Sequence, residues 1–214
     1  MKMVEFTKIE PTFREEEVLR YLGYGGRPPR MVEGRLGALV GVARGLLRPR
    51  AVWGVYGRAE LGGKELAVLP EPIRGVELFA LALCTVGDRV DDEIRALASE
   101  GKGAEALIMD ALATAAVSEL AEKVAKKIRG WAQGRGYSSS RAFEPGVGGF
   151  PLAGQRLIFD RLPAGELGVS LTGDLMMRPR KSLSFLIGIG KDIAEAPGPF
   201  SCAGCRKGAC PFRR

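Results

Sequence analysis

The sequence predicts an α+β fold, in which a twisted antiparallel sheet with flanking helices forms a single domain around one long, buried central helix. Its 214 residues are 46% hydrophobic and 27% charged, which is enough for one real core. Helical and strand-like segments do not alternate regularly along the chain, which favours α+β over α/β. Residues 104–131 give the longest helical pattern, and their middle, LIMDALATAAVSEL, is apolar on nearly all faces. Such a helix is expected at the centre of the core.

The first half of the chain is predicted to pass from helices to strands. The N-terminal part, residues 1–50, is expected to be helical, because apolar residues recur at helical spacing and Gly and Pro interrupt the pattern between two segments. β-branched and aromatic residues then predict a hairpin with a Gly-rich turn, followed by a buried strand. The expected helices cover 14–22 and 31–47; the expected strands cover 51–57, 65–70 and 76–87.

The second half is predicted to return to helices before a final strand pair. Asp88 is expected to cap a helix that ends near Gly101, before the long helix begins. Residues 132–150 are rich in Gly and Ser and are expected to form a loop. A helix is expected at 152–163, with Leu152, Leu157, Ile158 and Leu162 on one face. Residues 167–190 are expected to form two strands joined by a turn at Arg178 and Pro179.

Charge and composition divide the chain at its end. We expect one domain over residues 1–192 and a Pro/Gly-rich cysteine tail over 193–214. Residues 178–214 carry eight Lys or Arg and two Asp or Glu, which accounts for +6 of the net charge of +7. A nucleic-acid binder would usually be basic more uniformly, so no nucleic-acid partner is expected. A local basic end indicates either docking to an acidic partner or a solvated tail.

Several classes of site and location are disfavoured by composition. The chain has no histidine, so it offers no His-dependent catalytic dyad, no His-ligated metal and no imidazole for a cobalt ion. Acid–base chemistry would depend on carboxylates, Lys, Tyr or Cys. No apolar run approaches the roughly 20 residues of a membrane span. The N-terminus lacks a signal-peptide pattern, so a cytoplasmic location without membrane association is expected.

Three cysteines cluster in the last 13 residues, whereas Cys84 lies in an apolar run and is expected to be buried. Cys202, Cys205 and Cys210 have Cys-x2-Cys-x4-Cys spacing, which suits metal binding. The sequence predicts a metal site here, either zinc or an iron–sulfur cluster, that would need a further ligand. Two alternatives remain: redox-active or disulfide-forming thiols, and a disordered tail with incidental cysteines. Cys84 could supply the fourth ligand only if the tail folded back onto the core.

Three segments resemble the activation domain of cobalamin-dependent methionine synthase. They are VLRYLGY (18–24), the long helix that leads into RAFEPGVGGFP (141–151), and LTGDLMMRPRKSLSF (171–185). They occur in the family's order, at similar spacing, and together span nearly the whole chain. The third segment is the most specific, because it is similar to the family's Leu-Thr-Glu-Ser stretch followed by Met, Pro and a Ser-x-Ser pair. The chain thus resembles a stand-alone activation domain, and the resemblance implies the same fold.

The resemblance also implies an activity. The family's domain binds S-adenosylmethionine in a shallow groove and presents its methyl group to an oxidised cobalamin held by another domain, while an external donor supplies the electron. Here the cobalamin would sit on a partner, namely a separate corrinoid-bearing methionine synthase or another corrinoid protein. An acidic electron donor such as flavodoxin or ferredoxin would complete the system. The chain would then be an accessory part of a methyltransferase system, with no catalytic residue of its own implied.

The resemblance assigns candidate ligand-binding residues. Arg141 corresponds to the loop arginine that binds the methionine carboxylate, and a planar guanidinium can clamp a carboxylate bidentately. Phe143, Pro145 and Gly146 lie in the same loop, whose tyrosine position is Val147 here; Phe150 could supply an apolar surface instead. On the long helix, Ser118 aligns with the family's ligand-facing glutamate, and Glu119 is next to it.

Each candidate also has a structural interpretation. Arg141 could pair with a surface carboxylate, and Pro145–Gly146 could only shape a turn. Met176 and Met177 are expected to straddle a strand, one packed and one exposed. Ser182 and Ser184 are expected on one strand face, where they could satisfy local hydrogen bonds.

The sequence alone leaves two main functions and, as a third, a nucleic-acid binder that uses its basic tail. The first is a reactivation factor that presents S-adenosylmethionine to a separate corrinoid protein. The second keeps the fold but not the ligand: a redox or scaffold protein of a corrinoid or electron-transfer assembly, acting through its cysteine tail. Binding of S-adenosylmethionine discriminates between them.

Overall fold

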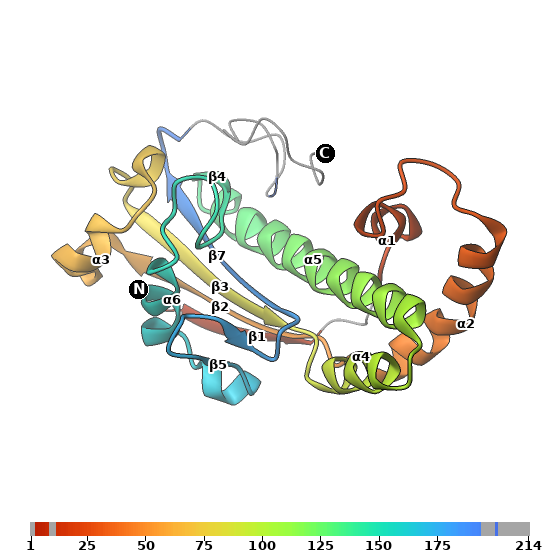
Figure 1. Cartoon of the computed structure of the whole chain (residues 1–214). Helices are drawn as coiled ribbons and strands as arrows, with labels where there is room; N and C mark the ends of the chain where they lie inside the picture. The colour runs from red at the N-terminus through yellow and green to blue at the C-terminus, as the bar shows by residue number, and fades with distance from the viewer. Residues whose placement is uncertain (1–2, 9–11, 194–199, 201–214) are drawn as a thin grey trace.

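A single five-stranded sheet organises the chain, which we describe from a computed structural model over residues 3–8, 12–193 and 200. The strand order is β1-β2-β3-β7-β4, and each neighbouring pair is antiparallel. A separate two-stranded sheet pairs β5 with β6. The predicted α+β class and single domain are confirmed (Figure 1). The strands are β1 (Met3–Lys8), β2 (Arg50–Gly57), β3 (Leu78–Thr85), β4 (Ser138–Phe143), β5 (Ser170–Leu171), β6 (Met177–Arg178) and β7 (Ser182–Gly190).

Helix α5 is the central element of the fold and crosses one face of the sheet (Figure 1). It spans Gly103–Gln133, and 15 of its residues are buried, in agreement with the predicted buried central helix. Helices α1, α2 and α4 pack against it, while α6 packs on the sheet. None of the helices in the described ranges combines the length and hydropathy that a membrane span requires. The other helices are α1 (Glu15–Tyr21), α2 (Arg30–Leu46), α3 (Gly63–Ala67), α4 (Arg89–Ser99) and α6 (Gly154–Arg161).

The centre of the sheet is buried on both faces, which explains the unbroken apolar run of β3. Ala80, Ala82 and Cys84 pack on the α5 side. Between them, the side chains of Phe79, Leu81 and Leu83 join a second cluster on the opposite face, which α6 covers. Successive side chains of a strand point to opposite faces, so a strand buried on both sides must be apolar at every position.

Strand β4 forms one edge of the sheet and covers only part of its neighbour. It pairs with β7 from Ser138 opposite Gly190 to Phe143 opposite Leu186, with a register irregularity between Ser139 and Ala142. The preceding part of β7, Ser182–Phe185, pairs with β3 alone. The chain leaves the sheet after β4 at this point, and the candidate ligand-binding loop begins here.

The predicted hairpin of 51–57 with 65–70 is wrong in its second strand. Residues 65–70 lie in and after the short helix α3, and β2 instead pairs with β3. The Glu65 carboxylate accepts a hydrogen bond from the Gly62 backbone N–H at 2.6 Å, which stabilises the first turn of α3. An apolar run this short does not distinguish helix from strand by periodicity.

The predicted loop at 132–150 contains the edge strand β4, so this part of the prediction is also wrong. The serines that suggested a loop have tertiary partners or are buried in the sheet. The Ser140 hydroxyl accepts a hydrogen bond from the Gly188 backbone N–H at 2.9 Å, and Ser139 is 1% exposed. Strand formation here depends on β7, which lies more than 40 residues further along the chain.

Smaller differences concern the ends of elements. The N-terminal part is not wholly helical, because β1 adds a strand to the sheet edge. The first predicted strand of 167–190 is reduced to the two-residue strands β5 and β6, whereas β7 matches the second. Helix α6 begins at Gly154, and Leu152 is exposed before it. Asp88 occupies the position before α4, but its side chain makes no capping hydrogen bond.

Candidate functional site

The guanidinium of Arg141 lies over an aromatic ring at the end of the sheet edge. Its Cζ atom is 4.2 Å from the centroid of Phe143, two residues further along β4 and therefore on the same side of the strand. Phe143 is 2% exposed and belongs to the cluster on the face opposite α5. Among the described residues Arg141 forms no ion pair, and its only hydrogen bond is a long one, 3.4 Å, to the Ala142 carbonyl. The expected alternative, a surface carboxylate partner, is not found there.

The loop after β4 folds back over Arg141. The Gly146 backbone N–H donates to the Phe150 carbonyl at 2.7 Å, which closes the loop. Gly148 has a φ of 59°, and a Cβ atom at this position would lie 3.1 Å from a terminal nitrogen of Arg141. Glycine is therefore required twice over, for its backbone conformation and for the close approach of the guanidinium. The result is a cation held between a ring and a bare backbone.

Pro145 and Gly146 lie on different sides of this loop. Pro145 lines a groove that reaches helix α4, and Gly146 lines a second groove of about 550 Å³ beside α3. The exposed Val147, at the position of the family's tyrosine, is 50% accessible to solvent. Phe150 is 1% exposed and packs in the core, so it offers the loop no open apolar surface.

Ser118 and Glu119 have partners on another part of the molecule. Ser118 Oγ lies 2.9 Å from the Tyr21 hydroxyl of α1. Glu119 accepts a hydrogen bond of 2.5 Å from Thr12 and pairs with Lys123 at 3.3 Å. Both residues thus hold the segment around α1 against α5. Within the described residues neither contacts Arg141, so a single site that contains all six residues stays a prediction.

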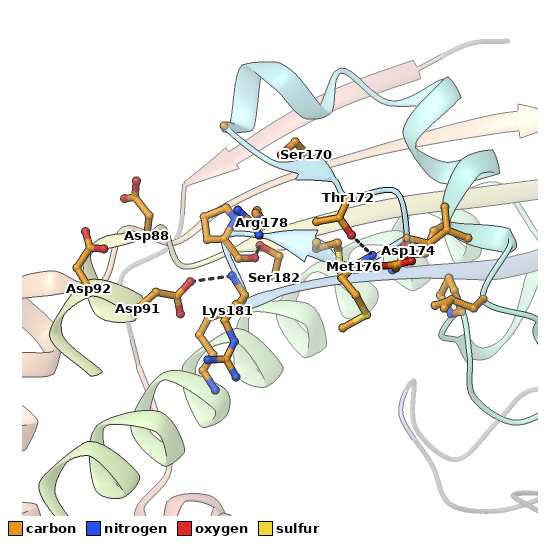
Figure 2. Close-up of a pocket in the computed structure, with 18 of the residues that line it drawn as sticks. Asp88, Asp91, Asp92, Ser170, Thr172, Asp174, Met176, Arg178, Lys181 and Ser182 are labelled. Carbon is orange, nitrogen blue, oxygen red and sulfur yellow. Dashed lines mark hydrogen bonds between the residues drawn. The ribbon is translucent and has the colours of Figure 1, made fainter. Parts of the chain in front are cut away.

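A groove of about 1120 Å³ opens between the start of α4, the β5–β6 sheet and α6 (Figure 2). Figure 2 shows Asp88, Asp91 and Asp92 together at the left of the view, with Thr172 and Met176 away from them to the right. The specific LTGDLMMRPRKS stretch supplies much of its lining. Met176 is 61% exposed, whereas Met177 packs against the core, as expected for two residues that straddle a strand.

Two deeply buried polar residues of this groove were not predicted from the sequence. Asp91 Oδ2 accepts a hydrogen bond from the Arg180 backbone N–H at 2.7 Å. Gln155 Oε1 accepts one from Ser184 Oγ at 2.6 Å. Asp91 lies in the acidic first turn of α4 and Gln155 in the amphipathic helix α6, where polar residues are usually solvated. The sequence contains a sign of burial only for Gln155, because its position falls among the apolar positions of the predicted helix.

Ser182 forms the expected local hydrogen bond, whereas Ser184 bonds to Gln155, which is distant in the sequence. Ser182 Oγ lies within hydrogen-bond distance of the Pro179 carbonyl, at 2.8 Å, and of Thr85 Oγ1, at 2.9 Å. Together with the bond between Ser184 and Gln155, these contacts attach the first residues of β7 to α6 and to the end of β3. The Ser-x-Ser pair therefore has a structural role that does not need a ligand.

The cysteine prediction is tested only in part. Cys84 is fully buried, as expected, and burial raises the pKa of its thiol, which disfavours the thiolate that a metal needs. A fourth ligand from Cys84 is therefore not supported. Cys202, Cys205 and Cys210 lie outside the described residues. Among the residues that are described, no group of three Cys, Asp or Glu side chains is placed to hold a metal ion.

The fold defines the class of protein: an α+β domain with a long helix across an antiparallel sheet. The chain matches a crystal structure described as the MetH reactivation domain bound to AdoHcy, with a TM-score of 0.64. The match covers 93% of this chain and 82% of that one, at 17% sequence identity. No model of a known protein family matches the chain, and no curated protein does. At this identity the likeness establishes the fold, which is the fold that the sequence resemblance implied.

Proposed function

We propose that this chain binds S-adenosylmethionine and presents its methyl group to a corrinoid held by a separate protein, as a reactivation factor. The observation that carries the proposal is Arg141, which lies over Phe143 at the loop that the sequence resemblance assigns to the ligand and forms no ion pair with any described residue. The solved structure of the same fold has AdoHcy bound, and AdoHcy carries the same amino-acid carboxylate as S-adenosylmethionine.

Arg141 is suited to a carboxylate in both charge and geometry. The contact with Phe143 limits the rotation of the Arg141 side chain, so less side-chain entropy is lost when a ligand binds. The absence of an ion pair within the described residues means that no internal carboxylate has to be displaced first. Of the loop glycines, Gly148 lies against the guanidinium, where a side chain would crowd it.

The contribution of the protein to methyl transfer would be positional. Holding the methyl carbon in line with the cobalt of a partner's corrinoid lowers the entropic part of the barrier. No proton has to be moved by a side chain for this transfer, so the lack of histidine is compatible with it. The cobalamin and the electron donor would belong to partners, and the proposal assigns this chain no catalytic residue.

The first prediction tests ligand binding. Isothermal titration of the full chain with S-adenosylmethionine is expected to give saturable binding. Arg141→Ala should weaken it about tenfold to a hundredfold, because a charge-assisted hydrogen bond contributes about 1.5–3 kcal/mol. Arg135→Ala is the matched control, since Arg135 also stacks on an aromatic ring, 4.3 Å from the centroid of Trp131, and also bonds a backbone carbonyl.

The outcomes separate the two functions. Equal losses for both variants would assign the effect to general stability or charge and contradict the role of Arg141. If the full chain does not bind S-adenosylmethionine even when the corrinoid partner is present, the redox or scaffold function is favoured instead. An iron and zinc assay of anaerobically purified protein, compared with Cys202→Ser, would then test that function.

A further inference from the structure

Helices α1 and α2 both pack on α5 (Figure 1), and an apolar cavity of about 210 Å³ lies between the three helices. Each helix supplies one buried residue to its lining: Val18 from α1, Leu36 from α2 and Leu112 from α5. Phe13 and Val40 are half-buried and complete the apolar part of the lining. An apolar side chain that enters this cavity leaves water and gains packing contacts. The proposed function uses none of these residues.

The size of the cavity suits a single ring. An engineered apolar cavity of roughly 150 Å³ holds benzene, whereas pockets for ordinary small molecules measure roughly 300–1,000 Å³. Gly37 of α2 also lines the cavity and is exposed, and a Cβ atom there would meet nothing within 4 Å. The cavity is therefore open to solvent beside Gly37, where a side chain can enter from outside.

Charged side chains surround the opening. Glu15 and Glu33 both line the cavity. Glu33 pairs with Arg27 at 2.7 Å, whereas Glu15 is exposed and forms no ion pair within the described residues. Arg44, which lines the cavity as well, lies over the Phe13 ring, 5.5 Å from its centroid. An aromatic side chain next to a cationic one therefore fits both the cavity and its opening.

This chain contains such a pair in its tail. Residues 201–214 include one aromatic residue, Phe212, and Arg213 follows it directly. The segment has four Lys or Arg and no Asp or Glu, so its charge complements that of Glu15. The segment lies outside the described residues.

The segment begins within reach of the cavity. Phe200 packs on Phe185 of β7, with the ring centroids 5.3 Å apart. Lys181 precedes Phe185 by four residues, which span at most about 14 Å, and its Nζ atom lies 2.8 Å from the carboxylate of Asp110. Asp110 is two residues before Leu112 on α5, so the start of β7 lies close to the cavity. The twelve residues that follow Phe200 can span up to about 40 Å.

We propose that residues 206–214 dock between α1 and α2, with the ring of Phe212 in the cavity and the guanidinium of Arg213 beside Glu15. The occupant is a segment of the same chain, and the proposal does not depend on binding of S-adenosylmethionine. Docking attaches the segment that contains Cys210 to the two helices. It also adds an apolar contact to α1, whose contacts with α5 include the hydrogen bond between Tyr21 and Ser118.

The test is a cross-link in the full chain. Arg213→Lys keeps the positive charge and supplies an amine, which a carbodiimide couples to a carboxylate in direct contact with it. Under reducing conditions, mass spectrometry of the digested protein is expected to find position 213 joined to Glu15 or Glu33. Adding Phe212→Ala should lower the yield of this cross-link about tenfold, because the segment loses the burial of its ring.

A matched pair of α2 variants locates the docked segment. Gly37→Leu fills the cavity, whereas Gly41→Leu adds the same side chain to the same helix at an equally open position that does not line the cavity. The cross-link yield should fall about tenfold in Gly37→Leu and stay unchanged in Gly41→Leu. S-adenosylmethionine affinity should be the same in both variants, which keeps a failure of this proposal distinct from a failure of the proposed function.

Three results would overturn the proposal. They are the absence of coupling between position 213 and Glu15 or Glu33, equal yields for the two α2 variants, and cross-links that join different molecules. The last is read from a mixture of unlabelled and isotope-labelled chain, where a cross-linked peptide of mixed isotope content would make a second copy the occupant. The Phe212→Ala comparison changes no residue of the described fold, so the proposal remains testable even if Gly37→Leu does not fold.

Discussion

Gly154 shows how one residue can determine the packing of an element. A Cβ atom at this position would clash with the ring of Phe150, which is 1% exposed in the core. The missing side chain lets the start of α6 lie directly on that ring. The same absence of a side chain has no such consequence in α2, where the Cβ positions of its glycines are open.

Gly154→Ala is expected to destabilise the fold by about 1–3 kcal/mol, because the buried ring of Phe150 must shift to admit the methyl group. Gly41→Ala is the matched control. It adds the same methyl group to an exposed position of α2 with open space around it and should stabilise the helix by about 0.5–1 kcal/mol. Urea unfolding measures both, and equal effects of the two substitutions would contradict the packing argument.

At the scale of elements, α1 and the residues before it are attached to α5 through polar contacts. Two of the residues that make them, Ser118 and Glu119, are ones that the sequence resemblance assigned to a ligand. Tyr21 reaches Ser118, and Thr12 bridges Glu119 and Lys123. Such contacts between helices are worth about 0.5–1.5 kcal/mol each, which is small enough for α1 to open locally before the whole fold does.

Tyr21→Phe is expected to lower the stability of α1 by about 0.5–1.5 kcal/mol, because Ser118 loses its partner while the ring is kept. Tyr24→Phe is the control, since the Tyr24 hydroxyl forms no hydrogen bond within the described residues. Amide hydrogen exchange of α1 measures the difference. Unchanged exchange in Tyr21→Phe would show that packing alone holds the helix.

For the whole molecule, the proposed ligand should stabilise the native state by mass action. A ligand at about 100 times its Kd adds about 2.7 kcal/mol. For a chain of 150–250 residues this raises the Tm by about 5–10 °C. The shift should be small in Arg141→Ala and intact in Arg135→Ala, as followed by circular dichroism during heating. A large shift in Arg141→Ala would place the ligand elsewhere.

The C-terminal tail carries the predicted metal site. Its three cysteines and much of the local positive charge lie in residues 201–214, outside the described structure. The metal site, the acidic electron donor and the corrinoid partner therefore stay predictions. The match to a reactivation domain covers 93% of the chain and concerns the fold.

The sequence by itself determined the elements whose signal is local and strong. The helical period and alanine content of α5, and the continuous apolar run of β3, each follow from residues next to one another in the chain. Tertiary structure alone decided the rest. Strand β4 exists because Ser139 and Ser140 meet β7, and Asp91 and Gln155 face one groove because Arg180 and Ser184 hold them there. Partners this distant leave no local pattern, because hydrogen bonding and burial depend on neighbours in space.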